Sequence, residues 1–232
     1  YILCQSNDKI PVEPHTKGGT QHPQEIHLVN YKQDKSVGLE SVLVDTIDGN
    51  ASLLNPLDGI VVEGINALCE GEQPAYATAM RFDGVTNLKI QDVRFTRNGP
   101  GAIWLNNAYN CVIRDCRIDG TMAADNVYGI VMGTVNNIFI SDCLITGCRH
   151  AFTTTAGVTK GVARWGTPQN VILNNCIINV PSKLELKQTR VGLDTHAEGY
   201  GILFRNCEVN LGSSTTNYGA FIRSRNVRFI GC

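Results

Sequence analysis

The chain has 232 residues, enough for one large domain or two small ones. A formal net charge of −1, with 18% charged residues, leaves no basic surface for a nucleic-acid partner. No apolar run approaches the ~18 residues of a membrane span and no signal peptide is visible, so no membrane insertion is expected.

The composition favours strands and tight turns over helices. Glycine (23) and asparagine (21) are frequent, whereas aromatic residues make up only 7%, and both frequent residues suit sharp turns. The nine cysteines include no Cys-x-x-Cys pair, so a zinc ribbon has no support. We therefore predict neither a metal site nor a cofactor.

Residues 1–57 carry no repeat and are rich in proline, histidine and glutamine. We expect an irregular N-terminal segment with incomplete coils there. The spacing of His15, His22 and His27 fits no standard metal site, so solvated loop histidines are the better interpretation. The chain begins at Tyr1 and ends within a repeat at Cys232, and we expect it to be a fragment of a longer protein.

A repeat with the consensus Asn-φ-x-φ-x-(Asp/Asn)-Cys-x-φ, in which φ is apolar, organises the chain from about residue 83 onward. Its six copies are spaced 23, 27, 33, 31 and 25 residues apart and start at Asn87, Asn110, Asn137, Asn170, Gly201 and Asn226. The alternation φ-x-φ is typical of a strand with one buried face. Asparagine tolerates left-handed backbone, so each copy predicts a bend followed by a strand. The (Asp/Asn)-Cys pair lies where the strand is expected to bend a second time.

Cysteine recurs at one position of this repeat, in Cys116, Cys143, Cys176, Cys207 and Cys232. Equivalent positions of successive coils face the same way, and a buried cysteine behaves as a small apolar residue. We expect an internal ladder of free thiols. The alternative is a disulfide framework, which is disfavoured because the position repeats continuously rather than in pairs.

Each repeat carries a second strand that opens with a small residue, at positions 101, 129, 151, 192 and 219. Two or three strands per coil of about 22–33 residues, with no helix between them, predict an all-β, single-stranded, right-handed parallel β-helix over residues 58–232. A leucine-rich repeat would need a helix in each unit, and a β-sandwich would not produce the fixed Asn…Cys pattern.

The coils that start at Asn137 and Asn170 are the longest, with 33 and 31 residues. Their additional residues lie at 155–169 and 180–190. Insertions in repeat proteins project as loops on one face, which is often the binding face. The segments 148–155 and 192–199, which are the densest in catalytic side-chain types, lie in these two coils, and this coincidence predicts a functional surface.

Period 2 places polar side chains of the two segments on one face. If Leu193 points inward, Asp194 and His196 point outward. The same counting on the preceding coil places Thr153 and Thr155 outward. Coils stack ~4.8 Å apart, so we expect these four polar side chains to lie side by side.

Five residues of the two segments are candidate catalytic groups: Arg149, His150, Asp194, His196 and Glu198. Glycoside hydrolysis, which we place first, needs two carboxyls ~5–9.5 Å apart, and Asp194 with Glu198 is the best pair. Elimination needs a base, His150 or His196, and a cation such as Arg149. Phosphodiester cleavage would use histidine and aspartate, with arginine on the phosphate.

A structural interpretation stands beside these chemistries. A face of threonine, aspartate and histidine can be a solvated side of the coil, on which Asp194 caps a bend and His150 donates to a backbone carbonyl. A glycan-binding surface without catalysis is the other alternative. The clustering of the polar residues between two long loops favours a functional surface.

The candidate substrate-binding residues are aromatic, basic or hydroxyl-bearing: Trp104, Thr153, Thr155, Lys160, Arg164, Trp165 and Arg223. Tryptophan suits stacking on a sugar ring, and lysine or arginine suits contact with an anion. Trp165 can equally anchor its own loop. If Phe221 points inward, Ile222 and Ser224 point outward and Arg223 reaches the rim of the surface.

The chain resembles the pectate-lyase-like parallel β-helix proteins, and most closely bacteriophage tailspikes and tail appendages. The resemblance rests on the stacked repeats and on the segments Cys148-Arg149-His150-Ala-Phe-Thr-Thr and Leu193-Asp194-Thr-His196, and it covers roughly residues 58–232. The chain lacks the Gly-Asp-Gly…Asp-Asp-Thr motif found at the start of many such domains. It also lacks the aspartate-rich calcium site of pectate lyases, which argues against calcium-dependent pectin cleavage.

This resemblance implies a homotrimeric protein of the phage tail that acts outside the cell, on the surface of a host bacterium. It implies that the protein binds, and often cleaves, a surface polysaccharide or teichoic acid. Further copies of the chain and other virion tail proteins would then be its protein partners.

Overall fold

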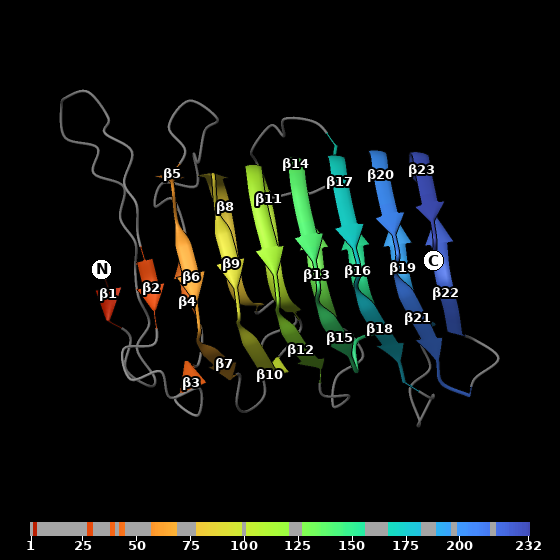
Figure 1. Ribbon diagram of the computed structural model, residues 1–232, viewed down its shortest axis with the longest axis horizontal. Helices are drawn as coiled ribbons and strands as arrows, with labels where there is room; N and C mark the ends of the chain where they lie inside the picture. Colours follow the sequence, from red (N-terminus) through yellow and green to blue (C-terminus); the bar gives the residue numbers. More distant parts are fainter. Residues whose placement is uncertain are drawn as a thin grey trace.

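A computed structural model shows the chain as a stack of β-coils (Figure 1). It describes residues 57–68, 78–98, 101–120, 127–155, 167–181, 189–195, 199–213 and 217–232, together with four short strands nearer the N-terminus. The first of these strands pairs in parallel with the second, and the other three pair in parallel with strands of the later coils. The domain boundary between residues 57 and 58 stays a prediction.

Every regular element in the described part of the chain is a β-strand, and the strands form two parallel sheets of 16 and 7 strands. The first sheet contains β1 (Ile2–Leu3), β2 (His27–Val29), β4 (Val42–Val44), β5 (Leu57–Asp58), β6 (Val61–Glu63), β8 (Thr78–Thr86), β9 (Lys89–Gln91), β11 (Gly101–Arg114), β13 (Tyr128–Met132), β14 (Val135–Ser141), β16 (His150–Thr154), β17 (Gln169–Asn174), β19 (Arg190–Thr195), β20 (Tyr200–Arg205), β22 (Asn217–Ile222) and β23 (Arg225–Ile230). The second sheet contains β3 (Gly38–Leu39), β7 (Asn66–Leu68), β10 (Arg94–Asn98), β12 (Arg117–Gly120), β15 (Leu144–Thr146), β18 (Ile177–Val180) and β21 (Glu208–Leu211).

Successive coils stack in register, as the repeat predicts. Strand β11 pairs with β14, β14 with β17, β17 with β20, and β20 with β23. In the second sheet, Ile118 lies beside Ile145, which lies beside Ile178. Each strand therefore has the same repeat position of the next coil as its neighbour, and the predicted parallel β-helix is confirmed.

Both predicted bends of the repeat have left-handed backbone. The asparagines that open the copies have φ between 51° and 58°, at Asn87, Asn110, Asn137, Asn170 and Asn226, and Gly201 replaces asparagine with φ of 68°. The acid or amide before the cysteine does the same, as at Asp142 and Asn175. The Asn175 side-chain amide donates to Asp142 Oδ1 at 2.7 Å, which links two coils and lowers the pKa of Asp142.

Apolar side chains at equivalent positions form columns in the core. Ile113, Ile140, Leu173 and Phe204 lie in register and are fully buried. The rings of Phe152 and Phe204 pack edge to face with centroids 5.8 Å apart. Burial of each such side chain contributes about 1.5–3 kcal/mol to folding, so the stacked columns supply much of the stability of the coil.

The cysteine position of the repeat forms a ladder of free thiols, as expected, although Cys232 in the last coil is exposed rather than internal. Cys116, Cys143, Cys176 and Cys207 are buried, and none of the cysteines in the described segments forms a disulfide. The disulfide alternative is therefore wrong for these residues. Hydrogen bonding to Cys143, together with burial, raises the pKa of Cys176 to about 12, so its thiol stays protonated and packs as a small apolar group.

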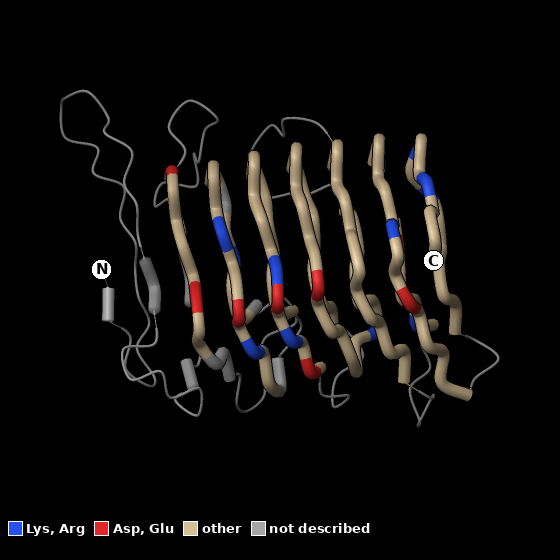
Figure 2. Tube along the Cα trace, viewed as in Figure 1, with Lys and Arg blue, Asp and Glu red and all other residues tan. Residues whose placement is uncertain are grey.

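Charged residues are sparse along the coils (Figure 2). The acids at the second bend, Asp92, Asp115 and Asp142, are exposed, and Asp115 lies 3.8 Å from Arg114 with both side chains about half exposed. Exposed pairs of this kind contribute about 0–1 kcal/mol each. The fold therefore depends on backbone pairing and on the core columns. A charged side chain that is buried in this fold needs stabilising contacts of its own.

Two glycines with left-handed backbone test how closely the chain packs at a bend. Gly147 has φ of 73°, and a Cβ there would overlap the Gly120 carbonyl, whereas Gly64 has φ of 65° and nothing within 4 Å of its Cβ position. We expect Gly147→Ala to lower the free energy of unfolding by about 3 kcal/mol, because strain and overlap add. Gly64→Ala should cost only about 1 kcal/mol, the strain alone. Urea denaturation measures both, and equal losses would contradict the packing argument.

Candidate functional site

Strands β11, β13, β16, β19 and β22 lie side by side and carry the segments singled out in the sequence. Each strand has a small residue at a bend of the sheet: Ala102, Gly129, Ala151, Gly192 and Gly219. A Cβ on Gly192 would lie 2.7 Å from a methyl carbon of Val209 in the second sheet, so the bend brings the two sheets together. The sequence placed the first of these residues at Gly101, which is wrong by one position because Gly101 pairs with Tyr128.

The bend decides which side chains point outward. Ala151 and Phe152 are adjacent in sequence, yet both pack in the core. His150 before them and Thr153 after them therefore point outward on either side of the bend. On β22 the equivalent residues Tyr218 and Phe221 stack with ring centroids 6.0 Å apart, so the outward side chains that flank the bend face each other.

Outward side chains of successive coils line up in two columns. We call these two columns, together with Arg149 and Arg223, the site face. The first column is Tyr128, His150, Val191 and Tyr218. The second column is Arg81, Trp104, Val131, Thr153, Asp194 and Phe221. Neighbours within a column lie on strands about 4.8 Å apart.

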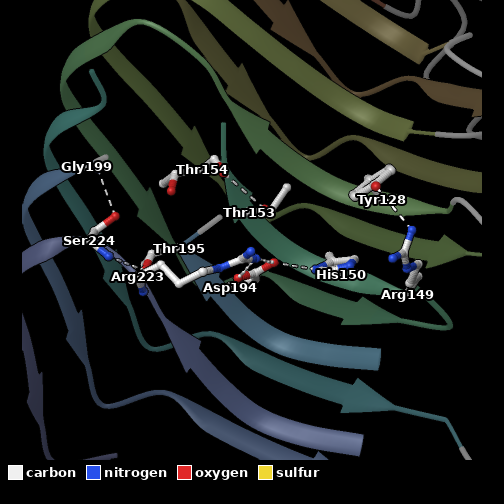
Figure 3. Close-up of polar contacts among 10 residues, drawn as sticks. All are labelled: Tyr128, Arg149, His150, Thr153, Thr154, Asp194, Thr195, Gly199, Arg223 and Ser224. Carbon is white, nitrogen blue, oxygen red and sulfur yellow. Dashed lines mark hydrogen bonds and ion pairs between the residues drawn. The ribbon is translucent and has the colours of Figure 1, made fainter. Parts of the chain in front are cut away.

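Asp194 is the centre of a buried polar cluster on the site face (Figure 3). Its carboxylate is 0% exposed, and His150, which is 4% exposed, places Nδ1 2.8 Å from Asp194 Oδ2. Arg223 Nη2 donates to both carboxylate oxygens at 2.9 Å. The structure thus brings together Asp194, His150 and Arg223, which are all candidate site residues, with side chains from three successive coils.

The surroundings of Asp194 keep it ionised. Burial alone would raise the pKa of this carboxyl, but its contacts with His150 and Arg223 outweigh burial and lower it. A carboxylate in this state is a poor proton donor at neutral pH. The arrangement suits a carboxylate that orients the imidazole of His150 and balances the charge of Arg223.

Tyr128 joins Arg149 to this cluster. The Tyr128 and His150 rings stack with centroids 5.2 Å apart. Arg149 Nη1 lies 3.4 Å from the Tyr128 hydroxyl and Arg149 Cζ lies 6.0 Å from the ring centroid. Tyr128 was not among the predicted site residues. Its place directly before Gly129 was a signal, because it occupies the position that His150 occupies one coil later.

Thr153 lies in the second column, where period 2 placed it, one residue before the end of β16, and Thr155 directly follows that strand. The outward direction of the Thr155 side chain stays a prediction. Thr153 is in register with Asp194, and its hydroxyl donates to the Thr154 carbonyl at 3.3 Å. The backbone N–H of Thr155 donates to the Met132 carbonyl at 2.8 Å. Contact of either threonine with a substrate stays a prediction.

Phe221 points outward. The prediction that Ile222 and Ser224 point outward assumed that Phe221 points inward, and this assumption is wrong. Phe221 is in register with Asp194 and its ring stacks on that of Tyr218, so it lies in the second column. The Arg223 guanidinium lies 4.7 Å from the Phe221 ring centroid, and the Arg223 backbone N–H donates to Thr195 Oγ1 at 2.6 Å. The backbone of Arg223 is therefore held by Thr195, and its guanidinium group is held by Asp194.

Trp104 belongs to the second column, two strands before Thr153. Its indole N–H donates to Asn106 Oδ1 at 3.2 Å, and Arg81 Cζ lies 5.6 Å from its ring centroid. The placement of Trp104 on the same face as Asp194 agrees with the sequence analysis. Its proposed contact with a substrate stays a prediction.

Five of the predicted site residues lie outside the described residues: Lys160, Arg164, Trp165, His196 and Glu198. Their predicted roles, including the carboxyl pair of Asp194 with Glu198, stay predictions. Within the described ranges, no three metal-binding side chains come together. The same ranges contain no helix of the length and apolarity needed to cross a membrane.

Comparison with known families agrees with this architecture. The family model of the right-handed β-helix region matches residues 78–232. The chain belongs to the right-handed β-helix family. The match also supports the right-handed winding expected from the sequence. Among curated proteins, no match to this β-helix was found, so its narrower kinship with phage tailspikes stays a prediction.

The lowered pKa of Asp194 predicts a pH-dependent contribution to stability. Because the folded pKa lies below the unfolded value of about 3.9, the contribution is present above that value and is lost as the pH falls through the folded pKa. We expect Asp194→Asn to cost about 3 kcal/mol at pH 7 and progressively less as the pH falls below about 3.9. Denaturation of the exposed-pair variant Asp115→Asn provides the control, with a loss of at most about 1 kcal/mol. A cost of Asp194→Asn that does not change with pH would contradict the ionised pair.

Proposed function

We propose that this β-helix binds a bacterial surface glycan along the site face. The observation that carries the proposal is the recurrence of aromatic and basic side chains along the site face, from Trp104 on β11 to Phe221 on β22. Aromatic rings pack against the apolar faces of sugar rings, and guanidinium groups donate to their oxygens. Right-handed β-helices commonly bind or degrade polysaccharides, which supports the same conclusion.

The biological setting that we propose is a phage tail. The resemblance of segments 148–154 and 193–196 to tail appendages supports a homotrimer that acts outside the cell on a polysaccharide or teichoic acid, together with other tail proteins. A solution mass of three chains, measured by light scattering, would agree with this arrangement. A stable monomer at micromolar concentration would count against it.

Two tyrosines of equal exposure on different faces test the binding surface. Tyr218 on the site face is 51% exposed, and Tyr200 on β20 is 53% exposed. We expect Tyr218→Ala to weaken binding of the recognised polysaccharide about tenfold, because a stacking ring is lost. Tyr200→Ala should leave it unchanged. Binding is measured by titration against a panel of purified bacterial envelope polysaccharides. Equal effects of the two changes would place the binding surface elsewhere.

Glycan cleavage is the second candidate function, and the pairing of Asp194 with His150 favours it. A buried carboxylate on Nδ1 fixes the tautomer and orientation of an imidazole, as in acid–base catalysis. Asp194 would then act through His150 and would not itself donate a proton. Because His150 is 4% exposed, binding is the function that the geometry supports best.

Cleavage is tested on the polysaccharide that the protein binds. If His150 transfers a proton, His150→Gln should slow product formation about 100-fold or more, while Tyr200→Ala leaves it unchanged. New reducing ends without unsaturation indicate hydrolysis, and unsaturated uronate absorbance indicates elimination. Circular dichroism must show that the variant is folded. Binding without either product, and without new phosphomonoester ends from a phosphodiester-linked polymer, would leave a receptor-binding module and reject the enzyme.

A further inference from the structure

A column of apolar side chains runs along the outside of strands β11, β14, β17 and β20. We call it the apolar stripe, and its members lie in register at one repeat position: Val112, Phe139, Ile172 and Leu203. Each member lies between two buried residues of its own strand, yet is itself partly exposed. Contiguous apolar side chains on an outer surface mark a place of contact with another molecule.

The outside of the second sheet carries an apolar pair at the same height in the stack. Leu144 on β15 and Ile177 on β18 are neighbours in register, and Ile177 is 43% exposed. They follow Phe139 and Ile172 in the same two coils, across the second bend. In the next coil the equivalent position is occupied by Glu208. These two coils therefore present apolar side chains on both sides of the second bend.

Arg205 and Glu208 give the two sides of the bend opposite charges one coil further along. Both residues are exposed, Arg205 at the end of β20 and Glu208 at the start of β21. Within the described coils neither side chain forms an ion pair. Arg205 donates to the Asn174 side chain at 2.7 Å, and Glu208 accepts from the Asn210 side chain at 2.8 Å. Each therefore keeps its charge for a partner outside its own chain.

We propose that copies of this chain pack side by side, with the apolar stripe of one copy against the second sheet of the next and equivalent coils at the same height. Phe139 and Ile172 then lie against Leu144 and Ile177 of the neighbouring copy, and Arg205 faces its Glu208. The inference rests on the homotrimer proposed above and adds the surfaces that form it. The site face is carried by other strands, β13, β16, β19 and β22 (Figure 1), so it stays accessible to a glycan.

Charge and spacing both favour a second copy of the chain as the occupant. Two stripes facing each other at equal height would oppose Arg205 to Arg205, whereas the stripe on the second sheet opposes Arg205 to Glu208. Every copy has coils ~4.8 Å apart, so apolar and charged levels match along the whole contact. Because the two surfaces differ, each copy uses both, and such a contact closes into a ring.

The first test measures the mass of the full chain by sedimentation over a dilution series. We expect three chains for the unchanged protein, and about 100-fold weaker association for Ile177→Asp, because a carboxylate would be buried against apolar side chains. Tyr218→Asp introduces the same charge at a similarly exposed position of the site face, where the side chain is 51% exposed, and should remain assembled.

The outcomes separate the interface from the trimer itself. A trimer that Ile177→Asp weakens no more than Tyr218→Asp would overturn the inference and leave the homotrimer standing. An unchanged protein that does not form trimers would overturn both, while glycan binding would still be decided by its own titration.

Charge reversal tests the same arrangement at exposed positions, where substitutions disturb the fold least. Glu208→Arg should weaken association about tenfold, because it faces Arg205 of the neighbouring copy, and Arg205→Glu should do the same. The double variant restores opposite charges and should recover most of the loss. Circular dichroism checks that each variant is folded. A double variant as weak as the single variants combined would overturn the inference.

Discussion

Backbone hydrogen bonds between successive coils are the constraint on which the rest of this protein depends. The N–H of Val112 donates to the carbonyl of Leu88 at 2.8 Å, and the same contact recurs up the stack. Because each strand pairs with its own equivalent in the next coil, a residue's place in the repeat decides the column to which it belongs. A slip of one residue would exchange the core columns with the outer ones. Inserted loops leave the strand pairing unchanged, which is why coils of very different length stack without a break.

Because of this pairing, polar groups that are distant in the sequence lie next to one another on the site face. Asp194, His150 and Arg223 come from three coils, and their contacts offset the cost of burying a carboxylate. The same contacts tie the three coils together, so the cluster stabilises the fold and also shapes the site. An ionised Asp194 is compatible with orientation of His150 and Arg223, and it is less compatible with proton donation during hydrolysis. The geometry therefore favours the imidazole and guanidinium groups around the carboxylate, rather than the carboxylate itself, as the groups that act on a ligand.

Period-2 counting succeeded wherever a strand was straight. It placed Asp194 and Thr153 on one face, and the register confirms that they are neighbours. It failed at the bend, where Ala151 and Phe152 both turn inward, and therefore left the direction of His150 open. The same failure, applied to β22, led to the wrong side for Phe221. A bend that places two adjacent residues in the core depends on how close the second sheet lies, which no local pattern records.

The sequence by itself determined the repeat, both left-handed bends, the thiol ladder and the core columns. These features follow from the backbone preferences of single residues and from alternation along one strand, so they can be seen within each copy. Only the tertiary structure decided that Tyr128 stacks on His150 and that Arg223 holds Asp194. Those contacts depend on the register between strands separated by inserted loops and on the bend where the two sheets meet, and both are set by the packing of the whole stack.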